Sequence, residues 1–107
     1  METNTKIPYK GMPATRFVGS DSYPMIVIDV KSDKRIIVAR MLDEDYKEYE
    51  KSPDSFNGKD LIKKYNVENG IEYTLRKNKR WLPKGYKLWE TCSIALGFAE
   101  FYWDPSF

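Results

Sequence analysis

Alternation of hydrophobic and polar residues along the chain predicts a series of short β-strands. The clearest is the run MIVIDV at residues 25–30, which is rich in β-branched residues and lies between turn signals. The short polar segment 31–34 predicts a hairpin turn, and residues 35–42 form the returning strand. Because side chains alternate between the faces of a strand, Arg35 and Arg40 fall on opposite faces, so at least one arginine must leave the core side near an edge.

Further strands are predicted on either side of this hairpin. They cover residues 14–18, 71–75, 80–82, 88–90, 93–96 and 98–103. Short strands joined by turns, on a chain of 107 residues, favour a mainly β protein built as a small antiparallel barrel or sandwich, and we expect an SH3-like barrel. Residues 1–10 are predicted to be a flexible N-terminal arm, and residues 11–107 a single β-barrel domain.

The middle of the chain, residues 43–70, has no clear period. It contains helix formers with little apolar repeat, Pro53 interrupts it, and one helical turn is possible at residues 59–65. A structureless loop of this length is unusual in a small domain. We therefore expect a short helical or irregular excursion that packs its apolar side chains against the barrel. These are Tyr46, Tyr49, Phe56, Leu61, Ile62 and Tyr65.

A basic segment, YTLRKNKRWLPKGYK at residues 73–87, carries the most suggestive chemistry. Its cations are Arg76, Lys77, Lys79, Arg80, Lys84 and Lys87. Cations gathered on one surface can neutralise phosphates, and Trp81 and Tyr86 could stack on unpaired bases. The alternative is a solvated hairpin with Trp81 in the core, which the opposite phase of Arg80 and Trp81 supports.

Composition narrows the function classes. The net charge is only +2 and the chain contains no histidine, so the commonest general base and the commonest metal ligand are missing. Cys92 is the single cysteine and is interpreted as a small buried hydrophobe. The acidic stretch at residues 43–54 lacks the glycine and ligand spacing of a calcium loop and is interpreted as a solvated, salt-bridged segment. We predict no enzymatic activity, no catalytic residue, no metal site and no cofactor.

The cysteine count and the length of the apolar runs indicate the cellular compartment. With one cysteine no intramolecular disulfide can form, and no run approaches 18 apolar residues. We expect a cytoplasmic protein that does not associate with membranes.

The C-terminal sequence FAEFYWDPSF is unusually aromatic. Part of it is expected to line the core, whereas Tyr102 or Phe107 would be exposed. An exposed aromatic strand at a sheet edge would invite a partner strand or a homodimer.

Three segments carry a resemblance to a known group of proteins. They are GMPATRFVGSDSYPMIVIDV, YTLRKNKRW and the terminal YWDPSF. In these segments the chain resembles a family of small phage- and prophage-encoded proteins of unassigned function. The resemblance implies a viral or mobile-element origin and transfers no catalytic residue. Small phage proteins of this size are often inhibitors of host defence, including anti-CRISPR proteins.

The first hypothesis is thus a non-enzymatic, phage-type binding protein in the host cytoplasm that occludes a host protein or nucleoprotein of the defence machinery. The residues expected to steer the partner are Arg76, Lys77, Lys79, Arg80 and Lys84, and the expected anchors are Trp81, Tyr86 and Tyr102. The second hypothesis is direct nucleic-acid binding through the basic hairpin. The third is a nucleotide-signal sponge, which would bind a small anionic messenger at a dimer interface.

Overall fold

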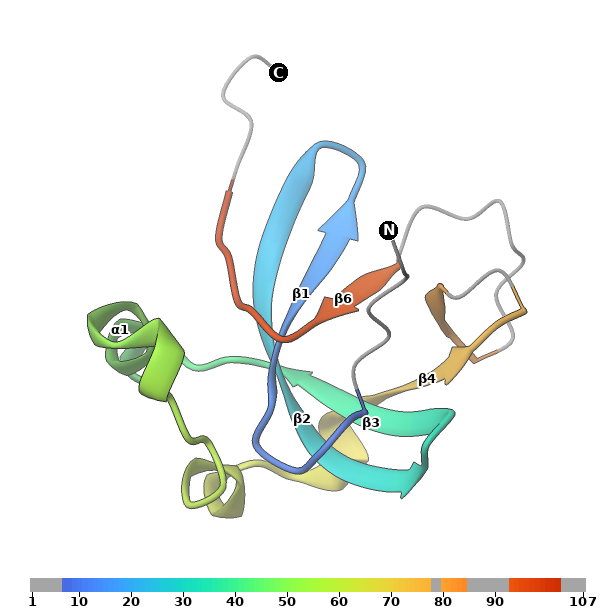
Figure 1. The fold of residues 1–107 in the computed structure, drawn as a ribbon, viewed down its shortest axis with the longest axis horizontal. Coiled ribbons are helices and arrows are strands. Elements are labelled where there is room, and N and C mark those ends of the chain that lie inside the picture. The colour runs from blue at the N-terminus through green and yellow to red at the C-terminus, as the bar shows by residue number, and fades with distance from the viewer. Residues whose placement is uncertain (1–6, 78–79, 85–92, 103–107) are drawn as a thin grey trace.

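In the computed structural model, which describes residues 7–77, 80–84 and 93–102, the chain forms a closed antiparallel barrel of six strands (Figure 1). The strands are β1 Pro13–Val18, β2 Asp21–Ser32, β3 Arg35–Arg40, β4 Ile71–Leu75, β5 Trp81–Pro83 and β6 Ile94–Leu96. They follow one another around the barrel in chain order, and pairing of β1 with β6 closes it. The predicted small antiparallel barrel is confirmed, and an SH3-like barrel is consistent with it.

Some predicted features of the fold cannot be compared with the structure. The strand expected at residues 88–90 and the buried Cys92 both lie outside the described residues. Within the described part of the chain, no helix is long and apolar enough to cross a membrane.

The long strand β2 lets such a short chain close into a barrel. Its first half pairs with β1 and its second half with β3. The register with β3 shifts between Val27 and Asp29 and again between Val30 and Ser32. Each shift inserts an extra residue on β2, and such bulges bend a strand and increase its twist. The strand of 12 residues therefore curls around the barrel instead of lying flat.

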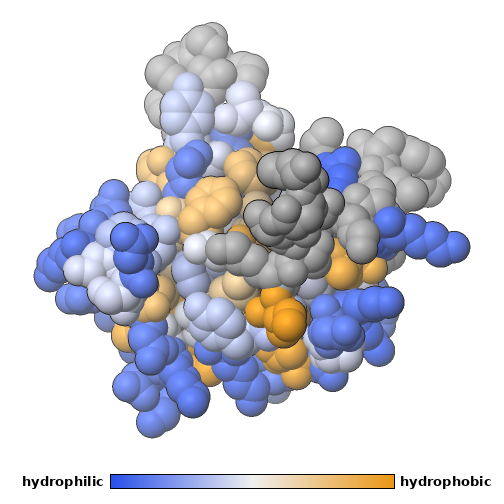
Figure 2. All heavy atoms as spheres, in the orientation of Figure 1, coloured by the Kyte–Doolittle hydropathy of each residue, from blue (hydrophilic) through white to orange (hydrophobic). Residues whose placement is uncertain are grey.

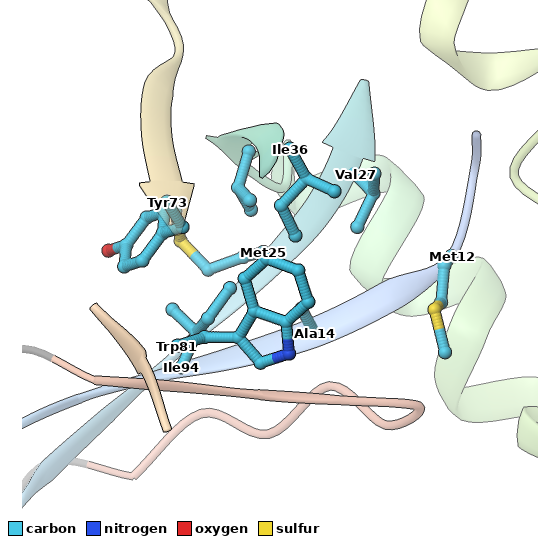
Figure 3. Packing of buried hydrophobic residues seen from close by; sticks show 9 residues of the cluster. Met12, Ala14, Met25, Val27, Ile36, Tyr73, Trp81 and Ile94 are labelled. Carbon is cyan, nitrogen blue, oxygen red and sulfur yellow. The ribbon is translucent and has the colours of Figure 1, made fainter. Parts of the chain in front are cut away.

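The barrel interior holds the first of two hydrophobic cores (Figure 3). Its buried members are Met12, Ala14, Met25, Val27, Ile36, Val38, Tyr73, Trp81 and Ile94. They occupy alternate positions on each strand, as expected when one face of a sheet is turned inward. Trp81 is only 5% exposed and belongs to this core.

A second core lies on the outer face of β2 and β3, under the excursion between β3 and β4. The excursion contains helix α1 Asp43–Lys51 and the 3-10 turns η1 Pro53–Ser55, η2 Leu61–Lys64 and η3 Val67–Asn69. The buried members of the second core are Ile26, Ile28, Ile37, Ala39, Met41, Tyr49 and Ala99. The other five side chains predicted to pack here, Tyr46, Phe56, Leu61, Ile62 and Tyr65, do pack against it while partly buried. The expected packing of the excursion is therefore confirmed.

The chain just before β1 also contacts the excursion. The backbone N–H of Gly11 donates to the carbonyl oxygen of Val27 at 2.7 Å. Gly11 has a φ of +89°, and a Cβ placed there would lie 2.5 Å from the backbone nitrogen of Lys59, so only glycine fits. Of the predicted arm, residues 1–6 lie outside the described residues.

The C-terminal segment leaves β6 and crosses the outside of the barrel toward the start of β2. The Thr15 hydroxyl donates to the carbonyl oxygen of Phe98 at 2.8 Å, and the N–H of Phe101 donates to the Tyr46 hydroxyl at 3.1 Å. Ser22 and Tyr102 exchange two backbone hydrogen bonds of 2.7 and 2.9 Å. The predicted strand at residues 98–103 is thus wrong over 98–101, because side chains satisfy the backbone there; Trp103 lies outside the described residues.

Candidate nucleic-acid interface

Two basic turns meet at one end of the barrel. The turn from β2 to β3 and the turn from β4 to β5 lie together because β3 and β4 are antiparallel neighbours, with Arg35 opposite Thr74. The N–H of Leu75 donates to the carbonyl oxygen of Lys34 at 2.9 Å. One step further along the chain, the N–H of Arg76 donates to the carbonyl oxygen of Arg80 at 2.9 Å. The basic hairpin is therefore joined to a second group of cations.

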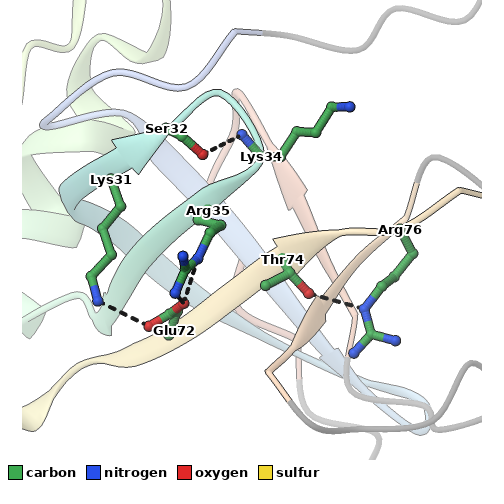
Figure 4. Close-up of polar contacts among 7 residues, drawn as sticks. All are labelled: Lys31, Ser32, Lys34, Arg35, Glu72, Thr74 and Arg76. Carbon is green, nitrogen blue, oxygen red and sulfur yellow. Dashed lines mark hydrogen bonds and ion pairs between the residues drawn. The ribbon is translucent and has the colours of Figure 1, made fainter.

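Glu72 organises the outer face beside these turns (Figure 4). Its carboxylate accepts from the Arg35 guanidinium at 2.9 and 3.0 Å and from the Lys31 ammonium at 3.1 Å. The hydrogen bonds from Arg35 and then from Lys31 hold the pKa of the Glu72 carboxyl below its usual value. Glu72 therefore stays ionised at neutral pH and fixes two cations on this face.

Arg76 is held against the strands and does not extend freely from the hairpin. Its Nε donates to the Thr74 hydroxyl at 2.9 Å and its Nη2 donates to the carbonyl oxygen of Pro83 at 3.2 Å. A shallow hollow of about 170 Å³ is lined by Lys34, Leu75, Arg76 and Lys77. This hollow joins the two turns into one surface.

We call this surface the basic face. Its cations are Lys31, Lys34, Arg35, Arg76, Lys77, Arg80 and Lys84. The acids within it are Asp33 and Glu72, and only 15% of the Glu72 side chain is exposed. In Figure 1 the turn between β2 and β3 and the end of β4, which carry this face, lie on the opposite side of the barrel from helix α1, whose first turn is acidic. Charge is therefore separated across the molecule even though the net charge is small.

The structure places the predicted site residues unevenly. Arg76, Lys77, Arg80 and Lys84 lie on the basic face, whereas Lys79, Tyr86 and Lys87 lie outside the described residues. The prediction that Trp81 anchors a partner is wrong. Its ring is buried in the barrel core, so it cannot stack on a partner. The alternative interpretation of a core tryptophan is the correct one, because Trp81 pairs with Leu75 and Ile94 inside the closed barrel.

Tyr102 is exposed, at 49%, but it does not join the basic face. It pairs with Ser22 at the start of β2, whereas the basic turns lie at the far end of that strand. Phe98 and Phe101 of the same C-terminal segment are also exposed, at 40% and 50%. The guanidinium of Arg40 lies 4.7 Å from the ring centre of Tyr23 and 5.9 Å from that of Phe101. Separately, Figure 2 shows hydrophobic residues at the surface near the middle of the face in view.

The prediction of a basic hairpin from the sequence did not include Lys31, Lys34 and Arg35, which also lie on the basic face. The signal was present, since the turn KSDKR resembles the later RKNKR in its charges. The two turns could have been joined only by knowing that β3 pairs with β4 across the excursion.

The described residues were also compared with the requirements of a metal site. Residues 7–77, 80–84 and 93–102 contain no group of three or more Asp, Glu, Cys or His side chains that could hold an ion. No family model matches the chain, and neither the curated proteins nor the solved structures compared with it gave a match.

Proposed function

We propose that the chain is a binding protein without catalytic activity, whose basic face contacts the phosphate backbone of a nucleic acid within a nucleoprotein and so occludes it. The observation that carries the proposal is the meeting of two basic turns at one end of the barrel. Seven described cations from separate parts of the sequence share this surface, and among the described residues Asp33 is its one well-exposed acid.

The basic face has the features that backbone recognition needs. Neutralising phosphates with lysine and arginine releases counterions, which gives affinity without sequence specificity. The Lys34 and Lys77 side chains are exposed, and neither has an ion-pair partner in the described part of the chain. Arg35 is already oriented by Glu72, so it loses less conformational freedom on binding.

The biological setting of the proposal follows from the resemblance to phage-encoded proteins. A small protein that covers the nucleic acid of a host-defence nucleoprotein would act as an inhibitor in the host cytoplasm. Electrostatic attraction by the basic face would speed its encounter with such a target.

The test compares two matched charge reversals, with binding to labelled single- and double-stranded oligonucleotides followed by fluorescence anisotropy. The double variant K34E/K77E reverses one cation in each basic turn. We expect its affinity at low salt to fall by at least about tenfold and its salt slope to shrink by about two. The control K47E/K63E makes the same change in total charge on the excursion and should bind almost like the parent.

Two outcomes would contradict nucleic-acid binding. Equal losses in both double variants would mean that only total charge matters, and a flat salt response of the parent would exclude phosphate neutralisation. The second result would favour another candidate function, occlusion of a protein through the exposed aromatic residues Phe98, Phe101 and Tyr102. Aromatic and arginine side chains are the usual anchors of protein interfaces. If this second function holds, a pull-down should recover a protein partner that resists salt and nuclease. Changing Phe101 and Tyr102 to serine should then abolish its recovery.

A further inference from the structure

A hollow of about 310 Å³ opens at the end of the barrel where β1 ends and β2 begins. We call it the mouth pocket. Its lining includes Arg16, Tyr23, Met25, Val38, Arg40 and Ile71. Its size is at the lower end of the range for small-molecule sites, and barrel mouths are among the places where such sites occur.

At the mouth pocket, the alternation of side chains along β1 and β3 places two arginines on the inward face of their strands. Arg16 shares a face of β1 with Ala14, and Arg40 shares a face of β3 with Val38; both of these neighbours belong to the barrel core. Interior positions of a small barrel are normally filled by apolar side chains. The two arginines are therefore exceptions to the pattern that builds the core.

Neither arginine has a polar partner in the described structure. The Nε atom of Arg16 is fully buried and makes no hydrogen bond. The guanidinium of Arg40 lies over the rings of Tyr23 and Phe101, and neither arginine forms an ion pair within the described residues. In contrast, Arg35 and Arg76 are hydrogen bonded. Buried donors without partners are rare in native structures, and a ligand is one of the reasons for them.

The acidic residue Asp21 lies close to the mouth pocket. The Tyr23 hydroxyl donates to the Asp21 carboxylate at 3.4 Å, but Asp21 does not line the pocket. Asp21 therefore leaves the two guanidinium groups without an ionic partner inside the hollow.

From this arrangement we propose that the mouth pocket binds a small phosphate monoester, with its phosphoryl group held between the guanidinium groups of Arg16 and Arg40. The planar donor fork of arginine matches phosphate oxygens, and two fixed positive charges match the charge of a phosphate monoester at neutral pH. The apolar wall formed by Met25, Val38 and Ile71 would contact the organic part of the ligand.

This site is separate from the basic face. Arg40 ends β3, whereas Arg35 begins it, so the mouth pocket and the basic face occupy opposite ends of that strand. The two proposals can therefore fail independently.

The test is a titration of the full chain with AMP, GMP and UMP. Isothermal titration calorimetry measures the affinity, and NMR of the arginine Nε–H groups locates the binding site. We expect the Arg16 Nε–H signal to shift and affinity to fall by at least about tenfold in R16M and in R40Q. R35Q should leave nucleotide binding unchanged, and R16M should leave oligonucleotide binding by the basic face unchanged. R40Q keeps the test decisive if R16M does not fold, because Arg40 is exposed.

Further arms of the titration identify which part of the ligand is bound. Inorganic phosphate should bind more weakly than the nucleotides but with the same dependence on Arg16 and Arg40, whereas adenosine should not bind. The proposal is overturned if no monophosphate moves the Arg16 signal, if adenosine binds as well as AMP, or if R35Q weakens nucleotide binding as much as R16M does.

Discussion

Asp45 is the most deeply buried carboxyl side chain in the described residues, at 2% exposure. Its carboxylate accepts from the Tyr65 hydroxyl at 2.6 Å and from the Lys64 ammonium at 2.8 Å. The Tyr65 oxygen in turn accepts from the backbone N–H of Leu42 at 2.9 Å, immediately before α1. This network joins the start of α1 to the end of η2 and thereby fixes the shape of the excursion.

The network predicts a ranking of variants at Asp45. D45A should lower the free energy of unfolding by about 2–3 kcal/mol, because it leaves the Tyr65 hydroxyl without its acceptor. D45N should cost roughly half as much, since the amide oxygen can still accept from Tyr65. Urea denaturation at pH 7 measures both, and D43A, which changes an exposed aspartate of the same first turn, is the control.

A double-mutant cycle gives the prediction a second check. If Asp45 and Tyr65 act as a pair, the losses in D45A and Y65F should not add in the double variant. Additive losses, or a D45A variant as stable as D43A, would contradict the network. Burial, and then the hydrogen bond to Asp45, raise the pKa of the Tyr65 hydroxyl above its ordinary value. The contribution of Tyr65 to folding stability is therefore complete at neutral pH, and it is lost only as pH rises above the ordinary pKa of tyrosine.

At the scale of elements, the described part of the C-terminal segment is held by two side-chain hydrogen bonds and by a single β-bridge. Thr15 and Tyr46 bond to its backbone from β1 and α1, and only Tyr102 forms a β-bridge. Ala99 inserts into the second core between these points. The segment should therefore open independently of the barrel, as elements with few ladder bonds do.

The variant T15V/Y46F tests this independence. Both changes keep the shape of the side chain and remove its hydroxyl, so the barrel strands should be little affected. We expect faster amide exchange at residues 98–102, measured by hydrogen–deuterium exchange, with exchange in β3 unchanged. Equal acceleration in both regions would show that the segment and the barrel open as one unit.

Element by element, the sequence predicted local structure better than it predicted contacts between distant segments. The strand at residues 25–30 and the hairpin that follows it were evident because β-branched alternation is a local signal. Helix α1 was not evident, since it buries only Asp45 and Tyr49 and so lacks a regular apolar stripe. The second basic turn was visible as charge, but its place beside the first depends on β3 pairing with β4 across an excursion whose path was not predictable.

At the scale of the whole molecule, the near-neutral total charge conceals a separation of charge. Acidic residues cluster on α1, and the basic face lies across the barrel from them (Figure 1). Such a molecule would orient in the field of an anionic partner before contact, with the basic end leading. Sequence composition alone suggested balance, because it sums charges that the fold separates.

Glu72 is the residue that moderates this separation, and its ionisation gives the basic face a pH dependence. Because its pKa is lowered in the folded state, its contribution to stability is present above its ordinary pKa and is lost as pH falls through the lower, folded value. Protonation there would also release Lys31 and Arg35 from their shared carboxylate. Oligonucleotide binding by the parent should therefore strengthen only in acid below the ordinary pKa of a carboxyl group, where folding also weakens.

The variant E72Q separates these two effects at constant pH. Without the carboxylate, Lys31 and Arg35 are free to contact phosphates, so at pH 7 E72Q should bind oligonucleotides more tightly and its salt slope should steepen by about one. The control E48Q removes the same charge from α1, where Glu48 pairs with Lys51 at 3.3 Å. Anisotropy titrations over a series of salt concentrations measure both variants. If E48Q strengthened binding as much as E72Q, the gain would come from total charge, whereas a gain confined to E72Q would place the bound phosphates beside β3 and β4.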